Sequence, residues 1–222
     1  MTAKRGMVVA IDGPAGAGKS TVADGVARRL GLARLDTGSM YRALTWAALE
    51  RSVDLDDAEA LQKLASSLEF RPSPEGIFVD GVLREQQIRD PAVSAVVSMV
   101  SRHPEVRAVM VAAQRRLADA GGVVIEGRDI GSIVAPGAPV KIFLTAAPEE
   151  RARRRREELA GAGHDLSHDR LMAEMEARDA RDDATTPLRP ADGAVVIDST
   201  GKTADDVADE IAAIARSVQE KA

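Results

Sequence analysis

The chain has 222 residues, a length that suits one domain, and 45% of them are apolar, which is enough for a sizeable core. Its net charge of −5 argues against broad binding to nucleic acid or membrane surfaces. Cysteine is absent, which excludes disulfides, thiolate metal sites and thiol chemistry. No apolar run approaches the ~20 residues of a membrane span, so we expect a soluble, cytoplasmic protein.

Five short apolar runs predict the strands of a sheet. The first, residues 7–11, is rich in β-branched residues and ends at a glycine-rich turn. The others are residues 32–35, 123–127, 140–146 and 194–198. Helical patterns separate these runs, and strands alternating with helices are typical of an α/β fold. We therefore predict a five-stranded parallel sheet covered by helices on both faces.

The predicted helices show apolar residues spaced three or four apart. In chain order they cover 19–30 and 38–50, then the region of Leu61, Leu64 and Leu68, then segments that start at Pro91, Pro104 and Pro148, the region of Leu171, Met172 and Met175, and a closing helix that starts at Thr203. Between them, Asp80–Gly81 separates two apolar triplets, a pattern that predicts a β-hairpin. We interpret this small β piece as an insertion.

The stretch after the first strand matches the phosphate-loop pattern G-x-x-x-x-G-K-[ST] in full, from Gly13 to Ser20. Glycines let successive backbone N–H groups surround phosphate oxygens at the start of a helix. Lys19 can bridge the β- and γ-phosphates, and Ser20 can ligate Mg²⁺. The residues predicted to bind ATP are Gly13, Pro14, Ala15, Gly16, Ala17, Gly18, Lys19, Ser20 and Thr21.

This motif predicts nucleoside triphosphate binding and leaves three uses open: a GTPase switch, a motor module, or a kinase for a small molecule. A GTPase should carry an N-K-x-D motif, which the sequence lacks. A motor usually needs a longer chain. A kinase needs cations near the transferred group and a pocket for the acceptor.

Arginines supply the candidate cations. Arg42 follows one predicted strand end and Arg128 follows another, and carboxyl ends of parallel strands share one edge of a sheet. The segment 177–183 adds further arginine and aspartate side chains beside a loop that a closing lid could bring in. Most of the arginine-rich run 151–156 is interpreted as a solvated face, because glutamates flank it.

Five motifs occur in the same order as in bacterial cytidylate kinases, so the chain resembles that family over nearly its whole length. They are GPAGAGKS, LDTGSMYR, EGRDIGS, APVKIFLTA and the two Arg–Asp pairs at 178–179 and 181–182. The resemblance implies a P-loop nucleoside monophosphate kinase fold over residues 1–222, with an acceptor-binding insert at about 62–100 and a helical lid at about 151–187. It also implies phosphate transfer from ATP to CMP or dCMP with Mg²⁺, by a monomer.

The resemblance implies a role for each matching side chain. Arg42 and Arg128 would hold the acceptor phosphate, whose oxygens match a guanidinium fork. Asp129 would accept from the exocyclic amine that uracil lacks. The implied catalytic set is Lys19, Arg42, Arg128 and Arg178, and the implied acceptor-binding set is Tyr41, Arg42, Ser98, Arg107, Arg128, Asp129, Arg178 and Asp182, with Arg178 and Asp182 on the ribose hydroxyls.

Catalysis of this kind needs no dedicated general base, because the acceptor phosphate is already a nucleophile. Glu126 either orients metal-bound water or is structural, and Ser20 is the only side chain assigned to the metal. The three histidines show no ligand spacing.

One position departs from the family pattern: Thr185 stands where an arginine is expected, and we hypothesise that Arg189 replaces it, with Arg181 as the other candidate. Two alternatives stay open: a UMP/CMP kinase of broader acceptor range, and a nucleotide-gated binding protein without turnover, which only the Thr185 departure suggests.

Overall fold

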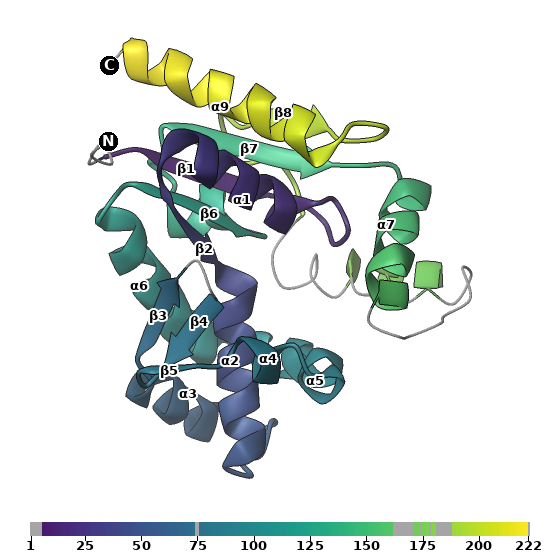
Figure 1. Ribbon diagram of the computed structural model, residues 1–222. Helices are drawn as coiled ribbons and strands as arrows, with labels where there is room; N and C mark the ends of the chain where they lie inside the picture. Colours follow the sequence, from purple (N-terminus) through teal and green to yellow (C-terminus); the bar gives the residue numbers. More distant parts are fainter. Residues whose placement is uncertain are drawn as a thin grey trace.

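Five parallel strands form the centre of the molecule, in the order β2-β6-β1-β7-β8 (Figure 1). A computed structural model describes residues 6–73, 76–161, 171–173, 175–177, 179–180 and 188–221. The strands are β1 (Val8–Asp12), β2 (Ala33–Asp36), β6 (Val123–Gly127), β7 (Val140–Thr145) and β8 (Val195–Asp198). The predicted parallel sheet and its five strands are confirmed.

The two faces of β1 supply two separate cores. Val8 and Ala10 point into a core shared with α2 (Thr37–Glu50) and α6 (Pro104–Asp119). Val9 and Ile11 point into another, shared with α1 (Lys19–Leu30) and α9 (Ala204–Glu220). Alternate residues of a strand face opposite sides, so a central strand buried on both faces is apolar throughout. This placement fixes the end of β1, where the phosphate loop begins, in the middle of the sheet.

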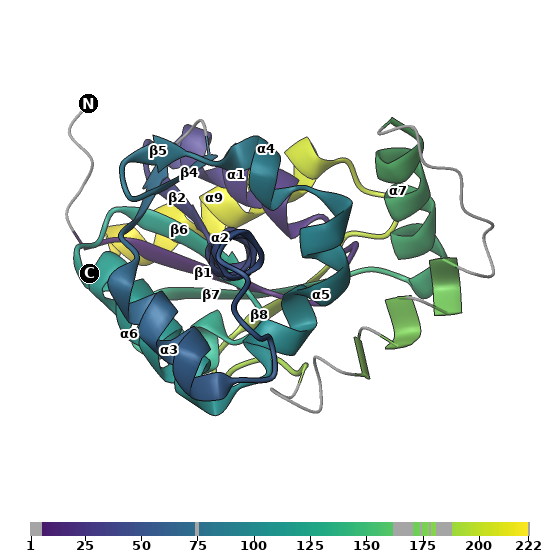
Figure 2. The ribbon, with the colours of Figure 1, turned by 90° about the horizontal axis from the view of Figure 1, so that it is seen from below.

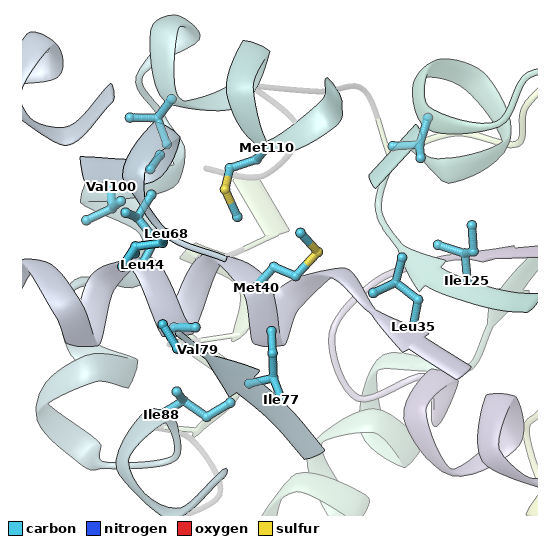
Figure 3. Packing of buried hydrophobic residues seen from close by; sticks show 14 of the residues in the cluster. Leu35, Met40, Leu44, Leu68, Ile77, Val79, Ile88, Val100, Met110 and Ile125 are labelled. Carbon is cyan, nitrogen blue, oxygen red and sulfur yellow. The ribbon is translucent and has the colours of Figure 1, made fainter. Parts of the chain in front are cut away.

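Elements between α2 and α6 form a second, smaller unit beside the sheet. It contains α3 (Ala58–Ser67), β3 (Phe70–Ser73), β4 (Gly76–Val79), β5 (Val82–Leu83), α4 (Glu85–Ile88) and α5 (Pro91–Ser101). Figure 2 looks down α2 and shows α3, α4 and α5 arranged around it. In Figure 3, Met40 and Leu44 of α2 lie among Ile77, Val79, Val100 and Met110, which ties this unit to α2 through a shared core.

The predicted hairpin is confirmed, and its turn has the chemistry expected of it. Asp80 and Gly81 both have positive φ, 50° and 80°, between antiparallel β4 and β5. Both central residues of a type I′ turn need positive φ, which Asp–Gly tolerates. A third strand, β3, pairs with β4 and was not predicted. The single tryptophan, Trp46 of α2, lies under the guanidinium of Arg84, which is 4.6 Å from its ring centre.

Proline and side-chain caps begin several helices where the sequence predicts them. Asp90 accepts a hydrogen bond from Ala92 N–H at the start of α5, and Thr203 forms a capping box with Asp206 at the start of α9. The predicted helix of α7 (Pro148–Gly161) is present, and Leu171 and Met175 pack against its Ala152. Within the described ranges, no helix combines the length and apolar character needed to cross a membrane.

Candidate active site

The phosphate loop joins β1 to α1 and has the backbone of an anion cradle. Gly13, Gly16 and Gly18 have φ of 150°, 74° and 90°, which disfavour residues with a Cβ. A Cβ on Gly13 would stand 2.0 Å from the carbonyl oxygen of Leu144 in β7, so the loop is packed directly against the sheet. The amino group of Lys19 donates to the carbonyl of Pro14 at 2.8 Å, which holds its charge over the loop. Backbone and charge together fit a phosphate chain.

A carboxylate stands beside the serine of this loop. The Ser20 hydroxyl donates to Oε2 of Glu126 at 2.8 Å, and Glu126, at the end of β6, is only 3% exposed. A serine hydroxyl has one proton and two lone pairs, so donation to Glu126 leaves its oxygen able to bind a cation. Hard oxygen ligands of this kind suit Mg²⁺. The residues present therefore fit the metal that accompanies a nucleotide.

Opposing effects act on the ionisation of Glu126. Burial raises the pKa of its carboxyl, and the nearby Asp36 carboxylate raises that pKa further. The Arg34 guanidinium, which donates to Oε1 from Nη2 at 2.8 Å and from Nε at 3.2 Å, lowers it, as does the Lys19 ammonium. Arg34 is thus a partner of this carboxylate that sequence reasoning missed.

Asp12, the last residue of β1, organises the segment that follows β6. Its carboxylate accepts hydrogen bonds from the N–H groups of Ile130 and Gly131, at 2.7 and 2.8 Å, and is 4% exposed. Burial raises the pKa of Asp12, and these two N–H donors oppose that rise. The N–H groups belong to a short π-helical turn, η1 (Ile130–Val134), which was not predicted. Asp12 thereby fixes the backbone directly after Arg128 and Asp129.

The two arginines expected to hold the acceptor phosphate come from different elements. Arg128 donates from Nη1 to the carbonyl of Gly13 at 2.8 Å, so it touches the phosphate loop. Arg42, in the first half of α2, donates from Nη1 to the hydroxyl of Ser94 on α5 at 2.6 Å. Both side chains are part-buried. Ser94, which the sequence did not single out, thus connects the arginine of α2 to the smaller unit.

Three of the residues in the implied acceptor-binding set, Tyr41, Arg107 and Asp129, lie close to one another. Arg107, near the start of α6, forms a hydrogen-bonded ion pair with the buried Asp129. Burial raises the pKa of Tyr41 to about 12, with Asp129 adding to the rise and Arg107 opposing it. Ser98 is half-buried on α5, which packs against both α2 and α6. The structure therefore brings together charges from α6 and the end of β6 beside the phenol of α2.

The arginine-rich run of α7 has two faces. Arg153 is exposed and pairs with Glu150 and Glu157, as the surface interpretation expects. Arg151 instead donates to the Ala15 carbonyl at 3.0 Å and to Asp179 at 2.5 Å.

Arg154, one turn of helix after Glu150, also reaches the phosphate loop. It donates to the carbonyl of Ala17 at 3.3 Å and to the backbone oxygen of Ser199 at 2.7 Å. Arg151 and Arg154 are three residues apart on a helix that starts just after β7, a spacing that could have indicated an inward face.

The site residues expected in the lid and just after it contribute no described contact to the site. Arg178, Arg181, Asp182 and Thr185 lie outside the described residues, and Arg189 is exposed. The part of the chain that the structure describes contains no group of three or more His, Asp or Glu side chains placed to hold a metal.

A family model described as cytidylate kinase matches residues 9–217. The chain belongs to the cytidylate kinase family. The cytidylate kinase of Geobacillus thermodenitrificans (strain NG80-2) is 50% identical over 214 residues, covering 94% of this chain and 96% of that protein. That of Pelotomaculum thermopropionicum (strain DSM 13744 / JCM 10971 / SI) is 48% identical over 212 residues, covering 92% and 94%.

The fold is also found in a solved structure of low sequence identity. The crystal structure of an uncharacterized protein from Eubacterium ventriosum ATCC 27560 superposes with a TM-score of 0.54 at 13% identity, covering 95% of this chain and 99% of that one. Likeness at this identity concerns the fold alone. For this member of the cytidylate kinase family, the recognised motifs and the described geometry therefore belong to one scaffold, a parallel sheet with a phosphate loop at the end of β1.

Proposed function

We propose that the protein transfers the γ-phosphoryl group of ATP to CMP or dCMP, giving CDP or dCDP and ADP. The bond between the γ-phosphorus and its bridging oxygen breaks, and an oxygen of the acceptor phosphate forms the new bond. Membership of the cytidylate kinase family makes the protein a nucleoside monophosphate kinase. The positions of the charged side chains support the assignment of roles within the site.

The phosphate loop is proposed to hold the triphosphate of ATP. Backbone N–H groups of this loop, other than at Pro14, which has none, and of the start of α1 would face the phosphates, Lys19 would bind the last two, and Thr21 follows in the first turn. Ser20, with Glu126 behind it, would hold Mg²⁺, which when bound offsets charge on the phosphate oxygens. Arg151 and Arg154 support the loop from its outer side through the carbonyls of Ala15 and Ala17.

Arg42, Arg128 and Arg178 are proposed to hold the acceptor phosphate and to offset the repulsion between two anionic reactants. The contact of Arg128 with the first glycine of the phosphate loop supports this, because it puts an acceptor arginine next to the donor site. Positioning and neutralisation of charge are sufficient for this reaction, since the attacking oxygen is already ionised.

The Arg107–Asp129 pair is the observation that carries the choice of acceptor. A carboxylate accepts from the exocyclic amine of cytosine, and a guanidinium donates to its ring nitrogen and carbonyl. Uracil has a carbonyl where cytosine has the amine, so it would face Asp129 with like polarity. Ser98 on α5 completes the proposed base site, and Tyr41 packs beside it. Arg178 and Asp182 are proposed for the ribose hydroxyls.

We further propose one functional domain over residues 1–222, with an insert at about 62–100 that closes over the acceptor and a lid at about 151–187 that closes over both nucleotides. The first insert boundary falls inside α3. Figure 1 shows the smaller unit between α2 and α6 on one side of the sheet edge where β1 ends, and α7 on another. This arrangement suits closure over the site from two directions. A cytoplasmic monomer without nucleic-acid or membrane partners is part of the same proposal.

Release of ADP from MgATP tests the function directly. It is measured with CMP, dCMP, UMP, AMP, dTMP and no acceptor, side by side. Strong turnover with CMP and dCMP, weak turnover with UMP and almost none without acceptor is the expected result. Equal turnover with UMP and CMP would indicate the broader kinase. Release that ignores the acceptor, or no release at all, would contradict the proposal.

A further inference from the structure

Arg34 pairs with two carboxylates, those of Asp36 and of Glu126, and Glu126 also accepts a hydrogen bond from the phosphate-loop serine, Ser20. Its Nη2 lies 2.8 Å from Oε1 of Glu126 and 3.7 Å from Oδ2 of Asp36. Glu126 is buried, whereas the Arg34 side chain is 29% exposed. Arg34 therefore reaches from the surface side of β2 to a carboxylate at the end of the neighbouring strand β6.

The contacts divide the two oxygens of Glu126 between two partners. Both Nε and Nη2 of Arg34 donate to Oε1, so the guanidinium grips one oxygen at two points. The other oxygen, Oε2, accepts from the Ser20 hydroxyl. A carboxylate held in this way cannot rotate without breaking one of the two arrangements. The contacts of Arg34 with Oε1 therefore keep Oε2 directed toward Ser20.

We infer that Arg34 is a positioning residue for the metal–nucleotide site, acting through Glu126, which it holds with Oε2 against Ser20. This inference rests on the proposed function, because it concerns the Mg²⁺ that Ser20 would ligate there. Arg34 touches neither the phosphate loop nor Ser20 in its described hydrogen bonds and ion pairs. Outer partners of this kind orient the groups around a metal, and their loss commonly lowers metal affinity by roughly 10- to 100-fold.

The surroundings of Arg34 allow it to be replaced without disturbing a core. A pocket of about 100 Å³ lies on its outer side, lined among others by Arg34, Asp36, Ser39, Ile77, Glu85 and Arg89. Arg89 offers a matched control in the same pocket. Its side chain is 50% exposed, pairs with Glu85 at 2.8 Å and lies 3.7 Å from Asp36. Arg89→Met removes the same charge from the same neighbourhood and leaves the two partners of Glu126 in place.

The test measures ADP binding by calorimetry, with Mg²⁺ and with chelator, for the native protein, Arg34→Met, Arg34→Lys and Arg89→Met. Mn²⁺ in place of Mg²⁺ gives an independent spectroscopic signal from the bound metal. We expect Arg34→Met to weaken the Mg²⁺-dependent part of ADP binding by about 10-fold and to leave metal-free binding unchanged. Arg34→Lys should restore part of the loss, and Arg89→Met should behave like the native protein.

A double-mutant cycle with Glu126→Gln decides whether Arg34 acts through Glu126. If it does, Arg34→Met adds little in the Glu126→Gln background. Additive losses, tighter metal binding in Arg34→Met, or an equal loss in Arg89→Met would overturn the inference. A Glu126→Gln protein with native metal dependence would overturn it as well. Because ADP binding needs no acceptor, failure here is distinct from failure of acceptor-dependent turnover in the native protein.

Discussion

Arg128 donates a hydrogen bond of 2.8 Å to the backbone carbonyl of Gly13, so the arginine that we propose for the acceptor phosphate touches the first residue of the phosphate loop. Asp12, one residue before Gly13, holds the backbone that follows Arg128 through the N–H groups of Ile130 and Gly131. The ends of β1 and β6 are thus fastened to each other in two places. These contacts set the distance between the phosphate loop and the site that we propose for the acceptor phosphate.

Replacement of Arg128 should reduce catalysis more than binding of ATP. Arg128→Met removes the charged donor that we propose beside the transferred group, and loss of one such donor commonly costs ~100-fold in kcat. Arg128→Lys keeps the charge and loses the fork, so it should restore only part of the rate. Steady-state ADP release with CMP as acceptor measures kcat for both variants. The control is Arg28→Met, which replaces an exposed arginine of α1 that pairs with Asp24. A kcat of Arg128→Met equal to that of this control would contradict the proposed role of Arg128.

Asp129→Asn should change the choice of acceptor. The amide keeps the shape of the carboxylate and weakens both its pair with Arg107 and its acceptor strength toward the cytosine amine. Hydrogen bonds to charged groups contribute about 1.5–3 kcal/mol, which corresponds to a ~10- to 100-fold fall in kcat/KM for CMP. Turnover with UMP should fall much less. The ratio of kcat/KM for CMP to that for UMP is the measurement, and an unchanged ratio would rule out Asp129 as the residue that distinguishes the bases.

Tyr41 should ionise late in the folded protein. Burial raises its pKa from the ordinary value of 10.0 to about 12. In the interval between these values the unfolded chain has released the proton that the folded chain still holds, so stability falls as pH rises through it. Tyr41 is the only tyrosine, and tyrosinate absorbance in a pH titration reports on it alone. A folded-state midpoint equal to that in concentrated guanidinium chloride would show that the phenol is not buried.

Gly13→Ala should destabilise the protein strongly. The new Cβ would lie 2.0 Å from the Leu144 carbonyl oxygen at a φ of 150°, and backbone on both sides has little freedom to move. We expect a loss of about 3 kcal/mol in the free energy of unfolding, measured with urea. Gly137→Ala is the matched control, because no heavy atom lies within 4 Å of its added Cβ. Equal urea midpoints for the two variants would show that the loop is not packed as described.

Arg154→Met and Arg153→Met should differ although the residues are neighbours on α7. Arg154 donates to Ala17 and Ser199, which joins α7 to the phosphate loop and to the end of β8. Arg153 contacts only Glu150 and Glu157, glutamates of its own helix, among its described partners. We expect a loss of ~2 kcal/mol for Arg154→Met and less than ~0.5 kcal/mol for Arg153→Met in urea unfolding. Similar losses would mean that the inward contacts of Arg154 are not stabilising.

Sequence patterns predicted the elements whose structure depends on residues close by in the chain. The five strands, the Asp80–Gly81 turn and the starts of the helices at Pro91 and Pro104 follow from hydrophobic period, turn residues and proline, and all are present. Strand β3 was missed because its sequence, Phe-Arg-Pro-Ser, has neither apolar alternation nor β-branched residues. It forms a strand by pairing antiparallel with β4.

Contacts between distant segments were harder to predict. Ser20 and Asp129 could be singled out because motifs carry them, and Arg107 because the resemblance to cytidylate kinases implied it. Arg34 and Arg154 could not, because nothing in their own neighbourhood shows that a buried carboxylate or a loop carbonyl lies within reach. Helical spacing and strand order narrow the choice of face, but the partner comes from more than 90 residues away in each of these cases.

Trp46 is an intrinsic fluorophore that lies where Arg84 of the smaller unit stacks on α2. Trp46 is the sole tryptophan, it belongs to the helix that carries Tyr41 and Arg42, and the cation above it comes from the segment between β5 and α4. A guanidinium over an indole ring alters its emission, so any change in their separation changes the intensity. Stopped-flow fluorescence of the unlabelled protein would thus test, in real time and without a reporter dye, the proposed closure of the smaller unit when CMP binds.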